Sequence, residues 1–124
     1  MKHRVETIGD ATLYLGDCLD ILPTLDKVDA VVTSPPYDNL REYEGQEPLD
    51  CLPVIEGIAE VLQDGGVCMW NVADATVNGS ETGTSFRQAL HAMECGLNLH
   101  DTMIYIREKV SFPERNRYFS GFEY

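Results

Sequence analysis

The residues best suited to chemistry are the consecutive Ser34-Pro35-Pro36-Tyr37. They follow residues 28–33, an apolar, β-branched run that is typical of a parallel strand covered on both faces. The prolines end such a strand, because they donate no backbone hydrogen bond and hold φ near one value. Ser34 precedes a proline and is therefore expected to be extended. A hydroxyl, two free carbonyl groups and an aromatic ring are thus presented together at the carboxyl end of a strand, where open α/β sheets bind ligands.

Thr33 and the four residues after it resemble the catalytic motif of the DNA amino-methyltransferases. That motif is Asp, Asn or Ser followed by Pro-Pro and an aromatic residue, after a hydrophobic strand. The Ser form resembles mainly the enzymes that methylate N4 of cytosine, whereas Asp or Asn is commoner in those acting on N6 of adenine. The resemblance extends over nearly the whole chain, with weaker matches at residues 15–17, 65–72 and 117–124.

The resemblance implies a site-specific DNA methyltransferase that uses S-adenosylmethionine to methylate an exocyclic base amine, with N4 of cytosine favoured over N6 of adenine. Such an amine is a poor nucleophile, because its lone pair is delocalised into the ring. The Ser34 oxygen and the carbonyls of Ser34 or Pro35 are fixed acceptors for its N–H groups. Tyr37 is suited to stack on a base that has swung out of the helix. The predicted catalytic residues are therefore Ser34, Pro35, Pro36 and Tyr37.

Two further sets of residues take their roles from the same resemblance. Asp17 and Thr33 are expected to contact the cofactor, with the Asp17 carboxylate accepting a bond from the adenine amine or a ribose hydroxyl. Asp17 also precedes a short helical segment and could cap it, and both roles are compatible. Arg41 and Tyr43 lie in a polar loop after the motif and are the predicted DNA contacts. A disordered acidic loop is the alternative there.

Other interpretations of the motif compete with catalysis. A Pro-Pro-aromatic tripeptide also occurs in ordinary loops that end a strand. A polyproline ligand for a WW-type domain fits less well, since Tyr37 follows Pro36 directly instead of after one intervening residue. A different class of function is that of a non-catalytic α/β assembly domain, which derives from such an enzyme and keeps the motif as a relic. Binding of S-adenosylmethionine would discriminate between the enzyme and the relic.

Length and charge limit the possible functions. The 124 residues, 44% of them hydrophobic, predict one globular domain over residues 1–124. The formal net charge of −12 argues against this chain binding DNA by itself, because nonspecific affinity for DNA comes largely from basic side chains that neutralise the phosphates. Basic residues interleave with aromatics in residues 107–124 and could form a nucleic-acid surface. Acidic residues there nearly cancel the charge, so an ordinary solvated segment is an equal alternative.

The chain shows no signature of a metal site or of a membrane segment. Its four cysteines are widely separated without a Cys-x-x-Cys pair, and each lies in an apolar segment, which predicts buried free thiols. The three histidines add no ligand spacing, so no metal is expected. No apolar run approaches the length of a membrane span, and a cytoplasmic protein is expected.

Hydrophobic periodicity and turn residues predict the elements that position the motif. A hairpin is expected at residues 4–8 and 12–15 around Gly9-Asp10, followed by a short helix that Pro23 limits. Thr84 or Ser85 is expected to cap the second long helix, which Gly96 closes. The remaining elements are a helix over 49–63 stopped by residues 64–66, a strand over 67–72, a flexible stretch over 73–84, a helix over 86–94 and a strand over 102–106.

The expected fold class is α/β, an incomplete Rossmann-like sheet of the S-adenosylmethionine-dependent methyltransferases. Relatives carry a Phe-x-Gly-x-Gly type segment, but no two glycines lie two residues apart in this chain. It therefore resembles the N-terminal catalytic half of the permuted members, with the glycine half missing. In that family the strands ending at Asp17 and Ser34 are separated by strands from the missing half, whose absence leaves unpaired edges. We expect pairing with another copy as a homo-oligomer, rearrangement so that these strands meet, or a fragment that lacks its C-terminal half.

Overall fold

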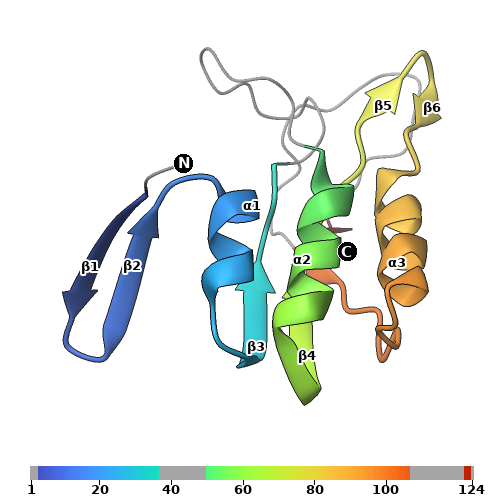
Figure 1. Ribbon diagram of the computed structural model, residues 1–124. Coiled ribbons are helices and arrows are strands. Elements are labelled where there is room, and N and C mark those ends of the chain that lie inside the picture. The colour runs from blue at the N-terminus through green and yellow to red at the C-terminus, as the bar shows by residue number, and fades with distance from the viewer. Residues whose placement is uncertain (1–2, 37–49, 107–121, 124) are drawn as a thin grey trace.

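A computed structural model describes residues 3–36, 50–106 and 122–123 of the chain (Figure 1). Helices and strands alternate in these residues, which supports a mixed α/β class. The described strands form four separate two-stranded sheets instead of one continuous sheet. The elements in chain order are β1 (Arg4–Ile8), β2 (Ala11–Leu15), α1 (Cys18–Ile21), the 3-10 helix η1 (Leu22–Thr24), β3 (Val28–Thr33), α2 (Cys51–Val61), β4 (Leu62–Trp70), β5 (Thr76–Val77), β6 (Ser80–Glu81), α3 (Thr84–Glu94), β7 (Tyr105–Ile106) and β8 (Phe122–Glu123).

The centre of the fold is the unit β3-α2-β4, in which β3 and β4 pair in parallel. Two parallel strands need a crossover connection, and α2 lies within it. Asp50 caps α2, because its side chain accepts a hydrogen bond from the Leu52 backbone N–H at 3.1 Å. Pro53 lies in the first turn of α2, where the backbone N–H groups have no partner within the helix and a missing one costs little.

The core lies between α2 and one face of the β3–β4 pair. Val54, Ile58 and Leu62 form its buried centre. Partly buried side chains from the strands and from α1 and η1 pack against that centre, including Val28, Val31, Cys68, Trp70, Cys18 and Leu22.

The opposite face of the β3–β4 pair is exposed, at Val32, Val67 and Met69. The expectation of a strand covered on both faces is therefore wrong for the described residues. Alternate side chains of a strand point to opposite faces, and α2 covers only one of them.

The N-terminal hairpin is confirmed. β1 and β2 pair antiparallel, with Thr7 opposite Thr12, and Gly9 in the turn has a φ of 59° that favours glycine. Within the described residues β2 pairs only with β1, and β3 only with β4. The strands that end before Asp17 and before Ser34 therefore do not meet, so the rearrangement considered above is not what this structure shows.

The short helix after β2 is also confirmed. Asp17 is its N-cap and accepts a hydrogen bond from the Leu19 backbone N–H at 2.9 Å. The α-helical part ends at Ile21, and Pro23 lies in the 3-10 turn that follows.

The predicted bounds around α2 and β4 need correction. The helix ends at Val61 instead of 63, and the strand covers Leu62–Trp70 instead of 67–72. Leu62 already pairs with Val28, and the register is irregular before Ala30 meets Val67. Gly65, with a φ of 79°, lies within this irregular part of β4, so the glycines are inside the strand and do not precede it.

The stretch predicted to be flexible contains a hairpin, β5–β6. Its turn residues Asn78 and Gly79 have φ values of 51° and 79°, the conformation that favours Asn-Gly in two-residue turns. α3 begins at Thr84, and its N-cap is Gly83 without a side-chain bond, so neither Thr84 nor Ser85 is the cap.

The predicted closure of α3 at Gly96 is confirmed. Gly96 has a φ of 98°, and its N–H donates to the Met93 carbonyl while the Leu97 N–H donates to the Ala92 carbonyl, which is a Schellman motif. The last predicted strand is shorter than expected, because β7 covers only Tyr105–Ile106 and pairs with β8.

The described cysteines are free thiols, but only Cys51 is buried, while Cys18, Cys68 and Cys95 are half-buried. Burial raises the pKa of the Cys68 thiol, which favours its protonated form. None of the described helices has the length and apolar character needed to cross a membrane. No group of three or more potential ligand side chains in the described residues could hold a metal ion.

Replacing Gly66 by alanine should destabilise the β3–β4 pair. The added Cβ would lie 2.8 Å from the Gln63 carbonyl oxygen and 3.1 Å from that of Asp29, and neither backbone atom can move freely. We expect Gly66→Ala to lower the free energy of unfolding by about 1–3 kcal/mol in urea titrations. The exposed substitution Gln63→Ala should change it by less than about 0.5 kcal/mol. Equal stability of both variants would contradict this packing.

Candidate active site

The predicted catalytic serine lies exposed at the carboxyl end of β3. Pro35 is buried and Pro36 is half-buried, so the diproline anchors the chain just beyond the strand. Within the described part of the chain, no hydrogen bond engages the Ser34 hydroxyl or the carbonyls of Ser34 and Pro35. The exposed Ser34 hydroxyl is therefore open to solvent at a point that the β3 strand end defines. Tyr37 lies outside the described residues.

The end of β4 holds the end of β3 in place. The Asn71 backbone N–H donates to the Thr33 carbonyl at 3.0 Å, and Trp70 lies opposite Thr33 in the parallel pair. The Trp70 indole packs against the core and donates to the Gln88 Oε1 at 2.9 Å. Trp70 therefore has a structural role and links the candidate site to α3.

A second link joins the segment after β4 to the start of α3. The Asp74 carboxylate accepts from the Ser85 backbone N–H at 2.6 Å and from the Ser85 hydroxyl at 2.9 Å. Asp74 therefore supplies the cap that Gly83 lacks. Sequence reasoning missed this role, because Asp74 lies well before the helix and only the β5–β6 hairpin brings it back.

The predicted cofactor residues lie at the ends of two different strands. Asp17 is exposed after β2, and one carboxylate oxygen caps α1. Its other oxygen makes no hydrogen bond within the described residues and is available to a ligand. Thr33 is half-buried and adjoins Ser34. In Figure 1, β2 and β3 run toward the same end of the molecule with α1 between them.

The predicted DNA contacts Arg41 and Tyr43 lie outside the described residues, as does Tyr37. Of the predicted site residues, the structure therefore places Ser34, Pro35, Pro36, Thr33 and Asp17. The first four are contiguous at the end of β3, whereas Asp17 lies after β2, at the start of α1.

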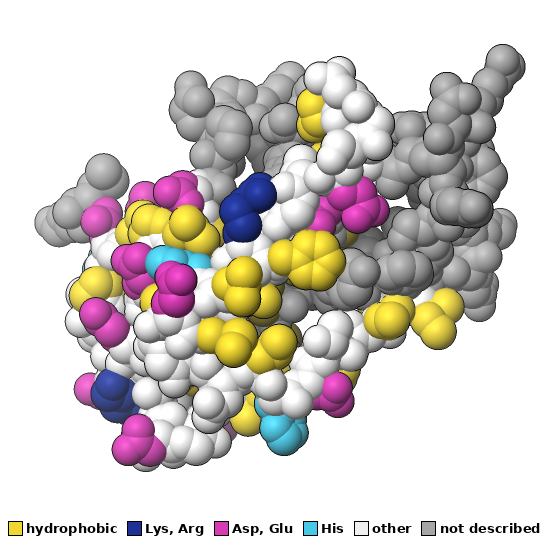
Figure 2. All heavy atoms as spheres, turned by 90° about the vertical axis from the view of Figure 1, so that its right-hand side faces the viewer, with side chains coloured by type: hydrophobic (Ala, Val, Ile, Leu, Met, Phe, Trp, Pro, Cys, Tyr) yellow, Lys and Arg dark blue, Asp and Glu magenta, His cyan; other side chains and the backbone are white. Residues whose placement is uncertain are grey.

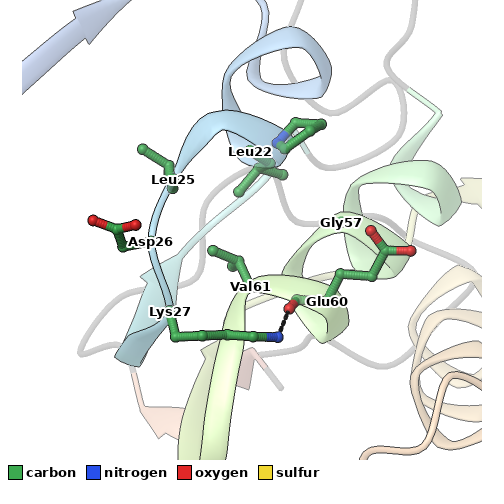
Figure 3. A pocket seen from close by; sticks show the side chains of 8 residues that line it. Leu22, Leu25, Asp26, Lys27, Gly57, Glu60 and Val61 are labelled. Carbon is green, nitrogen blue, oxygen red and sulfur yellow. Dashed lines mark hydrogen bonds between the residues drawn. The ribbon is translucent and has the colours of Figure 1, made fainter.

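A surface hollow of about 310 Å³ lies at the other end of β3 (Figure 3). Leu22, Leu25 and Val61 give it an apolar wall, and Lys27 reaches across it to donate to the Glu60 carbonyl. Because Lys27 directly precedes β3, this hollow is at the amino end of the strand, away from Ser34. Ligands of parallel α/β units bind at the carboxyl ends, so we assign no function to it.

Known proteins are similar to this chain in sequence. Over 110 residues the chain is 48% identical to the orphan methyltransferase M.BamHII of Bacillus amyloliquefaciens, an alignment that covers 89% of this chain and 38% of that protein. The chain is similar to methyltransferases. It is also 31% identical over 130 residues to the type II methyltransferase M.SfiI of Streptomyces fimbriatus, with 86% of this chain and 31% of that protein covered.

The chain thus spans about a third of the length of these methyltransferase relatives. No protein-family model and no solved structure matches it. The alignments cover most of the chain, so the similarity is not confined to the diproline motif.

Removing the Asp74 carboxylate should weaken the attachment of α3. Asp74→Ala leaves the Ser85 N–H without its acceptor, and Ser85 is buried. We expect a loss of about 1–2 kcal/mol in the free energy of unfolding, measured by urea titration. Asp74→Asn retains an acceptor oxygen and should lose clearly less. If both variants were as stable as the unaltered chain, Asp74 would not cap α3.

Proposed function

We propose that this chain carries the catalytic segment of an S-adenosylmethionine-dependent DNA amino-methyltransferase. The observation that supports this most is the exposed Ser34 at the end of β3, with unengaged acceptors backed by a buried Pro35. Its similarity to methyltransferases over most of the chain supports the same assignment.

The chemistry follows from the acceptors. The Ser34 Oγ and the neighbouring carbonyls accept hydrogen bonds from the exocyclic NH2 of a target base, which draws its nitrogen toward tetrahedral geometry and makes the lone pair available. S-adenosylmethionine, when bound, would supply the methyl group for this nitrogen, and the amine would pass one proton to solvent. Because the acceptors are held by the diproline and by β4, they need no reorganisation when the base arrives.

Asp17 and Thr33 are suited to bind one part of S-adenosylmethionine, and the chain offers no Gly-x-Gly pair for its methionine end. S-adenosylmethionine supplies an electrophilic methyl group on a sulfonium. The free Asp17 carboxylate oxygen suits its adenine amine or a ribose hydroxyl, and Thr33 adjoins the reacting position. The chain has no pair of glycines two residues apart, so we propose that residues other than such a glycine pair hold the methionine end.

The substrate we propose is DNA, with N4 of cytosine favoured over N6 of adenine because the motif begins with Ser34. Tyr37 is proposed to stack on the flipped base, and Arg41 and Tyr43 to contact the DNA. With a net charge of −12, this chain needs a further basic surface for most of its affinity.

A chimera tests the catalytic role. The chain would replace the matching 110-residue segment of M.BamHII, and transfer of labelled methyl groups to DNA would be measured. We expect transfer, and a loss of about 100-fold on Ser34→Ala, which removes one fixed acceptor. Ser80→Ala, at an exposed serine on β6, is the matched control and should keep full activity.

The outcomes separate the candidate functions. A folded but inactive chimera would favour the relic assembly domain over the enzyme. Unchanged transfer by Ser34→Ala would remove Ser34 from the chemistry. Digestion of the product DNA and mass spectrometry would identify the methylated base, and N6-methyladenine would reverse the substrate preference.

Calorimetry on the unaltered chain tests the division of the cofactor site. We expect little or no heat on titration with S-adenosylmethionine, since Asp17 and Thr33 alone provide few contacts. Tight binding, abolished by Asp17→Ala, would show that the glycine half is not required.

A further inference from the structure

α3 is an amphipathic helix whose apolar side faces solvent and whose polar side faces the rest of the molecule. Phe86, Leu90 and Met93 lie at spacings of four and three residues and form one apolar stripe, yet they are 59%, 61% and 48% exposed. The buried positions of the same helix are the polar Ser85 and Gln88, at 7% and 6%. Figure 2 shows hydrophobic side chains gathered on this face of the molecule.

Hydrogen bonds fix this orientation of the helix. Gln88 accepts from Trp70, and Ser85 donates to Asp74. The Nε2 of His91 lies 3.0 Å from the Glu56 carboxylate on α2. Rotating α3 to bury the apolar stripe would break all three contacts, so the stripe stays at the surface as a candidate interaction site.

Charges of opposite sign lie on one flank of the stripe. Viewed along a helix of 3.6 residues per turn, Arg87 and Glu94 are displaced from Phe86 by about 100° and about 80° in the same direction. Both side chains are exposed. Arg87 contacts Thr84 at 3.3 Å, and Glu94 lies 3.7 Å from the Nδ1 of His91. Because both side chains are exposed, each can leave its present contact for a partner in another molecule.

We propose that the α3 stripe binds a second copy of this chain, with the two α3 helices antiparallel across a two-fold axis. In that arrangement Leu90 meets Leu90 of the second copy, and Phe86 meets its Met93. The same register places Arg87 beside Glu94 of the second copy, on the shared flank, and symmetry repeats this pair. The stripe is therefore complementary to itself in both shape and charge.

The dimer should be weak and sensitive to charge. Three side chains per copy make a small interface, so we expect association to be weak and the dimer to form mainly at high protein concentration. The net charge of −12 on each copy opposes association, and the two Arg87–Glu94 pairs offset part of this repulsion. The proposal does not depend on methyl transfer.

Sedimentation of the full chain over a range of concentrations at low salt tests the interface. We expect a monomer–dimer equilibrium that Leu90→Glu abolishes. Leu13→Glu introduces the same charge at a residue 52% exposed on β2 and should leave the equilibrium unchanged. Circular dichroism checks that each variant is folded.

Charge reversal tests the register. Arg87→Glu alone and Glu94→Arg alone place like charges together in each homodimer, so each should weaken association by at least about tenfold. A mixture of the two variants restores both pairs of opposite charge, and heterodimers should form with near-original affinity. A chain that stays monomeric at all concentrations, a Leu90→Glu variant that dimerises normally, or a mixture no better than its components would each overturn the proposal.

Discussion

The parallel pairing of β3 with β4 is the constraint on which the other features depend. It places Thr33 beside Trp70, and the Asn71 N–H on the Thr33 carbonyl extends the pair to the strand ends. Ser34 and Pro35 leave the strand at that fixed point. α2 stabilises the pair by burying Val54, Ile58 and Leu62 against one face of it. An acceptor site of defined position therefore follows from an apolar core.

Two links to α3, one from Trp70 at the end of β4 and one from Asp74 in the segment after it, extend this rigidity away from the candidate site. Trp70 to Gln88 and Asp74 to Ser85 attach α3 through its polar side, where buried polar groups need partners. The consequence is an apolar stripe that faces outward. The proposed dimer surface thus follows from how α3 is attached, and Trp70, which lies opposite Thr33, connects α3 to the candidate site.

Two strand surfaces of the described residues face solvent. Val32 and Met69 lie on the uncovered face of the central pair, and both strands of the β1–β2 hairpin are exposed throughout. Parallel strands are usually covered on both faces. In the described residues, the central β3–β4 pair is covered by α2 on one face only.

The sequence by itself determined the local features: the Gly9-Asp10 hairpin, the Asp17 cap, the strand that ends at the diproline and the Gly96 closure, because each depends on residues within a few positions. Tertiary structure decided the rest. Whether Gly65 and Gly66 precede or interrupt β4 depends on pairing with Val28 and Ala30. The cap from Asp74 and the outward stripe of Leu90 depend on contacts between residues distant in sequence, which no local pattern encodes.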